Sequence, residues 1–210
     1  MVRRENNLGL RRGPFIDFVT GQKTSFDDSK KDIWFSIFMK CDEISQCTLR
    51  KVNVFFWKKH DKLTEQRCKF FKELNLEYKD FDFKIGVGRV DFLMKMKVVE
   101  LKKNITNNTI EICLKMGYDT LFKHLITTQR ELAFDAIVMS LHLKNYELAK
   151  WSAKKVLLSK IQWDLDSEFL IASLELIKRY NSRYDHAIIS RYAYRNPNIS
   201  KEVLKFLDEL

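Results

Sequence analysis

A short residue pattern recurs at nearly even intervals from about residue 80 onward. Four of its five copies have an acidic residue three positions after their start. Two apolar residues, or an apolar and a small one, come next, and lysine usually follows. Successive starts are separated by 29, 27, 28 and 27 residues. The copies start at Gly88, Gly117, Lys144, Ala172 and Ile199. Because regular spacing of this kind is the signature of repeated structural units, it restricts the folds open to this part of the chain.

Most copies follow another short amphipathic run, so each unit is predicted to be a helix, a tight turn and a second helix. Glycine costs little in a left-handed turn, which explains Gly88 and Gly117, and Asn145 is a tolerable substitute in the third copy. One helix pair cannot bury its apolar face alone, but stacked pairs share a continuous core. The sequence therefore predicts a mainly α fold, with a helical-repeat solenoid over residues 79–210. A helical bundle with chance spacing is the alternative.

The composition agrees with helices joined by short turns. The 210 residues include six glycines and two prolines, fewer than a sheet protein with many tight turns usually needs. Hydrophobic residues make up 45% of the chain, which is enough to build a core. The formal charge of +10 would attract nucleic acid, acidic proteins or anionic lipid, although scattered basic residues are also typical of an ordinary soluble surface.

The repeated segment resembles the second helix of ankyrin repeats, whose usual sequence is Gly-His-Leu-Glu-Val-Val-Lys-Tyr-Leu. Residues 117–125 and 144–151 carry the resemblance best. The step is shorter than the ~33 residues of ankyrin repeats, and the Thr-Pro-Leu-His opening of each repeat is missing. The resemblance implies divergent ankyrin-like units with reduced hairpin loops, of a kind familiar from large DNA viruses, and a protein-binding role.

Residues 26–78 are predicted to form a helical unit of their own, after a flexible polar arm at residues 1–25. Their sequence resembles an F-box, because an acidic residue followed by isoleucine, an Ile-Phe pair, a leucine, a valine and a late aromatic residue stand where that motif has them. Phe26-Asp27 replaces the usual Leu-Pro opening. The resemblance implies docking on the small adaptor subunit of a cullin-type ubiquitin ligase. A helix pair that only caps the solenoid is the alternative. The expected adaptor-binding residues are Ile33, Trp34, Ile37, Phe38, Leu49 and Val52.

One set of residues matches a metal-dependent nuclease motif of the Asp…Glu-x-Lys kind. Asp91 and Glu100 would hold Mg²⁺, and Lys102 would stabilise the attacking water or the developing phosphate charge. This chemistry needs a β-hairpin with strands at residues 89–93 and 97–101, and the apolar alternation over residues 81–87 favours strands. Helix surfaces within the first repeat explain the same residues. The four histidines show no metal-ligand spacing with one another or with cysteine, so no metal or cofactor is expected.

A basic nucleic-acid-binding protein is the other alternative. Trp151 and Trp163 are interleaved with lysines and could stack on bases. The lysines of this expected basic face are Lys95, Lys97, Lys102, Lys103, Lys154, Lys155 and Lys160.

No signal peptide and no membrane-spanning run is visible, and the four cysteines have no paired spacing, as in a reducing compartment. These features predict a cytoplasmic protein. The pairs Arg3-Arg4 and Arg11-Arg12 leave a nuclear location open. The favoured interpretation is a non-enzymatic interaction scaffold, a viral modulator of the host that links an unknown target to a ubiquitin ligase.

Overall fold

The computed structural model describes residues 15–16, 23–24, 31–52, 54–74 and 79–209, and most of these residues are helical. The two strands within these ranges have two residues each. β1 (Phe15–Ile16) pairs antiparallel with β2 (Lys23–Thr24). The predicted mainly α class is therefore confirmed. None of the helices in these ranges is both long and apolar enough to cross a membrane.

Three helices form the N-terminal unit: α1 (Lys31–Lys40), α2 (Glu43–Val52) and α3 (Val54–Glu73). Each contacts the other two. The centre of the unit is aromatic, since the ring of Phe38 stacks on that of Phe56 at 5.8 Å between centroids. The boundary predicted between residues 78 and 79 falls between α3 and the next helix, beside residues 75–78, which lie outside the described ranges.

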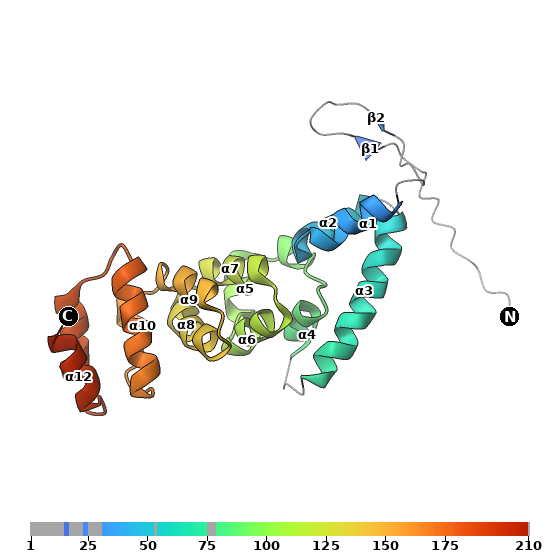
Figure 1. Ribbon diagram of the computed structural model, residues 1–210. Helices are drawn as coiled ribbons and strands as arrows, with labels where there is room; N and C mark the ends of the chain where they lie inside the picture. The colour runs from blue at the N-terminus through green and yellow to red at the C-terminus, as the bar shows by residue number, and fades with distance from the viewer. Residues whose placement is uncertain (1–14, 17–22, 25–30, 53, 75–78, 210) are drawn as a thin grey trace.

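The helices from α4 onward, except α11, which contacts α12 and η4, stack in two rows (Figure 1). In the first row α4 contacts α6, α6 contacts α8, α8 contacts α10, and α10 contacts α12. In the second row α5 contacts α7, and α7 contacts α9. Figure 1 shows α1–α3 at one end of this elongated stack and α10 and α12 at the other. The bounds are α4 (Asp80–Gly86), α5 (Val98–Asn104), α6 (Asn107–Met116), α7 (Asp119–Thr128), α8 (Ala133–His142), α9 (Tyr146–Ala153), α10 (Ser167–Tyr180), α11 (His186–Tyr194) and α12 (Lys201–Asp208). Three short 3₁₀ turns, η2 (Leu93–Lys95), η3 (Arg130–Leu132) and η4 (Leu158–Lys160), lie in the connections.

The first three predicted turn positions have a left-handed backbone. Gly88 has φ +74°, Gly117 has φ +70° and Lys144 has φ 56°. At the third turn, the prediction for Asn145 is wrong, because Lys144 takes the left-handed conformation. Asn145 instead caps α9, and its side chain accepts a hydrogen bond from the Leu148 amide at 3.2 Å. At Gly88 an added Cβ would also meet the end of the Arg67 side chain, which would have to move.

At the copies that start at Gly88, Ala172 and Ile199, the repeat pattern does not coincide with a helix pair. Ala172 lies inside α10, whose buried residues Leu170, Leu174 and Ile177 share one face, so one long helix replaces the predicted turn. After Gly88 the chain forms turns and η2 instead of the second helix of a pair. Ile199 precedes α12, a helix of the first row and not of the second.

The alternation over residues 81–87 does not produce strands, because α4 covers most of it. This short helix is covered on more than one side. Phe83 packs on Phe71 with ring centroids 5.9 Å apart, Phe81 packs on Phe92 at 5.4 Å, and Ile85 is fully buried. Apolar residues at every second position therefore fit a helix with several neighbours as well as a strand.

Candidate interaction site

The N-terminal unit exposes large apolar side chains along α1. Ile33 is 58% exposed and Ile37 45%, and they are neighbours because they lie four residues apart. Phe35 and Met39 form a second exposed pair at the same spacing, with the Lys59 ammonium 4.4 Å from the Phe35 ring centroid. The side of α1 that packs against α2 and α3 lies between these two exposed pairs.

The six expected adaptor-binding residues differ in how far their side chains are exposed. Ile33 and Ile37 are exposed, as docking requires. Trp34 is half-buried with its ring edge-on to Phe56, and Leu49 is also half-buried. Phe38 is fully buried, so the expectation that it has an exposed part is wrong. The side chain of Val52 lies outside the part of the chain that can be described.

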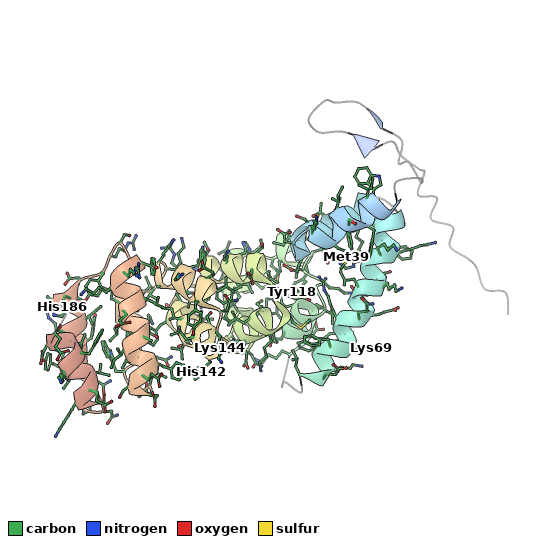
Figure 2. All side chains as sticks on the ribbon, viewed as in Figure 1. Met39, Lys69, Tyr118, His142, Lys144 and His186 are labelled. Carbon is green, nitrogen blue, oxygen red and sulfur yellow. The ribbon has the colours of Figure 1, made fainter. Side chains whose placement is uncertain are left out.

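A cleft of about 410 Å³ lies where the N-terminal unit meets the turn between α6 and α7. Figure 2 labels Met39 and Tyr118, which line it from the two sides. Apolar and polar side chains alternate in its wall. The lining residues are Met39, Cys41, Glu43, Gln46, Leu63, Gln66, Arg67, Phe70, Met116, Gly117 and Tyr118.

Two charged residues of this wall are only partly satisfied within the described ranges. Glu43 is 8% exposed, burial raises its pKa, and its Oε2 has no hydrogen-bond partner. Arg67 donates from Nη2 to Oε1 of Gln46 at 2.9 Å, while its buried Nη1 has no acceptor. Its guanidinium lies 5.2 Å from the Tyr118 ring centroid. Both unpaired atoms are inaccessible from the cleft, so the cost of leaving them unpaired falls on the packing behind its wall.

A buried cysteine–histidine contact links α2 to α3, and the same cysteine bonds to the stack. Sγ of Cys47 lies 3.3 Å from Nε2 of His60 and donates to the Gly88 carbonyl at 3.1 Å, and Oγ1 of Thr64 lies 3.3 Å from Nδ1 of His60. Burial is the largest cause that lowers the pKa of His60, to about 4, and burial raises the pKa of the Cys47 thiol. Both groups are therefore neutral at neutral pH, which suits a structural link and not a thiolate nucleophile. Sequence spacing gave no sign of this contact, because the two residues lie on different helices.

The protein is expected to lose about 2 kcal/mol of stability between pH 7 and pH 5 through His60 alone. The unfolded chain binds a proton at the ordinary histidine pKa of 6.5, whereas the folded chain does so only near pH 4. This stability is therefore present above pH 6.5 and is lost as the pH falls toward 4. Urea denaturation at both pH values measures the difference. It should shrink in His60→Gln and persist in His124→Gln, a change at an exposed residue of α7. An unchanged pH dependence in His60→Gln would contradict the assignment.

The structure lacks the hairpin on which the nuclease interpretation depends. Asp91 lies in a turn with its carboxylate 3.7 Å from the Lys51 ammonium, and Glu100 and Lys102 lie exposed on α5. Helix α5 occupies most of the second expected strand. Within the described ranges, no three residues among His, Cys, Asp and Glu are grouped so as to hold a metal ion.

The aromatic residues of the expected nucleic-acid face are not both available. Trp163 is 9% exposed and packs in the core, so the expectation that it stacks on bases is wrong. Trp151 is half-buried, with Phe122 at 6.4 Å and the Lys155 ammonium 5.4 Å from its ring. Four of the lysines lie in η2, α5 or the connection between them, and three follow α9, so they come from two separate parts of the chain.

The comparisons with known proteins add no relative. No family model, curated protein or solved structure matches this chain. What the chain does is therefore inferred from its own residues.

Proposed function

We propose that the chain is a protein–protein interaction scaffold in which the N-terminal unit holds one partner and the helical stack holds another. The observation that carries this proposal is the exposed apolar surface of α1, whose Met39 also lines a cleft. Exposed Ile33 and Ile37 offer apolar area to a partner, and such area is typical of the buried centre of protein interfaces.

The F-box-like resemblance suggests the partner of this surface, the small adaptor subunit of a cullin-type ubiquitin ligase. The chain would then act by position, since one end holds the adaptor and the stack holds a target for modification. The ankyrin-like resemblance supports a protein as the target, because stacked helix pairs make long surfaces suited to such contacts. A role of this kind in modulating a host cell belongs to the same proposal.

Docking and capping are compatible in this arrangement. The N-terminal unit contacts the stack through α2 with α7 and α3 with α4, and Cys47 reaches the Gly88 carbonyl. The inward surfaces therefore cover the end of the stack, while α1 keeps Ile33 and Ile37 on the outside. The cleft adjoins the other exposed pair of α1, since Met39 lines it, and its volume and mixed wall suit a short peptide segment.

The double substitution Ile33→Asp/Ile37→Asp is expected to abolish binding of the purified adaptor, because it places two charges at the centre of the docking surface. Retention on immobilised adaptor should fall by more than about tenfold, the effect of losing about 1.4 kcal/mol. Val98→Asp/Val99→Asp is the matched control, since these residues are 62% and 68% exposed on α5.

Three results would count against the proposal. If the wild-type chain does not bind the adaptor, the F-box-like role is wrong. If both double variants weaken binding equally, the α1 surface has no special role. If Phe70→Ser in the cleft reduces binding and the α1 variant does not, the partner occupies the cleft alone. Phe38 is unsuitable for this test, because a change at a buried residue would alter folding as well.

A further inference from the structure

A second, smaller pocket lies on the stack, away from the N-terminal unit. Its volume is about 190 Å³, and its wall is strongly polar. Three segments distant in sequence form it: the start of η3, the residues that follow α9, and the turn after α10. The lining residues are Arg130, Lys154, Lys155, Val156, Leu157, Asn181, Ser182 and Arg183.

Four cations and no carboxylate line this pocket. Two acidic side chains of neighbouring segments form ion pairs with other lysines, Glu131 with Lys160 at 3.8 Å and Glu147 with Lys150 at 2.8 Å, although Glu147 also interacts electrostatically with Lys154. Within the described ranges none of the four pocket cations has a carboxylate within 4.0 Å; Lys155 has only the Trp151 ring, 5.4 Å away. Like charges that converge without counter-ions repel one another, so an anion in the pocket would relieve that cost.

A buried asparagine holds the segments of the pocket together. Asn181 is 5% exposed, and its Nδ2 donates to the carbonyls of Ala153 and Val156, both at 3.0 Å. Its Oδ1 accepts a hydrogen bond from the Arg183 amide at 2.9 Å. The side chain is therefore bonded on both ends and fixes the turn after α10 against the end of α9. This bracing fixes the backbone at Arg183 against the segment that carries Lys154 and Lys155, so the three cations belong to segments held together.

We propose that this pocket binds a compact polyanion of the pyrophosphate class, with two adjoining phosphate groups. Four cations are sufficient to balance the charge of such a group, and arginine with lysine is the usual pair of donors for phosphate oxygens. The small volume favours a short anion over a nucleotide base. A nucleic-acid strand supplies one charge per phosphate along its backbone, which suits an extended basic track more than a closed pocket. The inference goes beyond the scaffold proposal and involves none of its residues.

Calorimetric titration of the full chain with sodium pyrophosphate tests this assignment. The wild-type chain should bind, and Lys154→Gln/Arg183→Gln should bind at least about tenfold more weakly, because half of the convergent charge is removed. Lys102→Gln/Lys103→Gln is the control, since it removes the same net charge from exposed positions on α5. This control should stay within about twofold of the wild type, because no contact to the anion is removed.

Each other outcome overturns the proposal. Absence of pyrophosphate binding by the wild-type chain excludes the site. Equal weakening in both double variants means that net charge attracts the anion without a specific pocket. If a single-stranded RNA oligonucleotide binds through Lys154 and Arg183 while pyrophosphate does not, the cluster recognises a nucleic-acid backbone instead. Circular dichroism of the variants separates these results from loss of fold, and none of the substituted side chains is buried.

Discussion

Replacing Phe38 with alanine will lower the free energy of unfolding by about 3–5 kcal/mol, whereas the same change at Ile37 will cost less than about 1 kcal/mol. The two residues are adjacent on α1, but Phe38 is fully buried against the Phe56 ring and Ile37 is 45% exposed. Alanine at Phe38 loses the buried area of an aromatic ring and leaves a cavity among Trp34, Phe56 and the α2 helix. Urea denaturation of the two variants under one condition gives both values.

The comparison also tests how α1 lies on its unit. Equal destabilisation by the two substitutions would mean that Ile37 is buried and that α1 is turned about its axis. In that case the exposed surface proposed for the partner would not exist. If only Phe38→Ala destabilises, then Ile37 is free for binding studies, and a loss of adaptor binding in its variants can be assigned to the contact itself. The stability measurement therefore has to precede any interpretation of binding.

Periodicity and turn chemistry were sufficient to predict the helical class and the left-handed residue of the first two turns of the stack. Gly88 and Gly117 could be assigned because glycine tolerates a left-handed backbone and because each follows an apolar run. Lys144 could not, since nothing in a lysine favours that conformation, and Asn145 was the better candidate by residue type. The backbone of Lys144 is held instead by its neighbours, whose amides and carbonyls close the turn after α8.

The location of Ala172 inside a helix could not be predicted from the spacing. The five copies start at similar intervals, whereas the helices near them are not evenly spaced. The sequence pattern gives only the number of residues between copies. The row that a helix joins also depends on the length of the connection before it. The connection at residues 154–166 is long, and after it α10 is one long helix and α12 contacts the first row. The spacing near 28 therefore continues in the sequence where the helix pairs do not.

The candidate sites were predictable only in part. Ile33 and Ile37 could be singled out because their motif is local. The same motif included Phe38, since a sequence pattern does not say which side of a helix faces its neighbours. The Cys47–His60 contact, the cleft and the basic pocket each combine residues far apart in the chain. Those combinations follow from how helices pack, and packing cannot be read from spacing alone.

The second large effect is expected at a buried hydrogen bond between two helices of the first row. Oγ1 of Thr109 donates to Oδ1 of Asp82 at 2.6 Å, and both residues are almost completely buried. The other donor to this carboxylate is the Lys79 amide, at 3.5 Å from Oδ2. Thr109→Val keeps the shape of the side chain but removes this donor, together with the oxygen that accepts from the Thr106 amide at 3.1 Å. It is expected to lower the free energy of unfolding by about 3 kcal/mol, because a buried carboxylate is left poorly satisfied.

A matched control and a second substitution test whether the destabilisation comes from the poorly satisfied Asp82 carboxylate or from the loss of any hydroxyl group. Thr127→Val removes a hydroxyl that donates to the Lys123 carbonyl on the exposed side of α7, and it should cost less than about 0.5 kcal/mol. Asp82→Asn in the Thr109→Val background removes the buried charge, so the double variant should be less destabilised than the sum of the two single changes. If the two effects simply add, Thr109 does not stabilise α4 on α6 through this carboxylate, and apolar packing alone holds the first two helices of the row together.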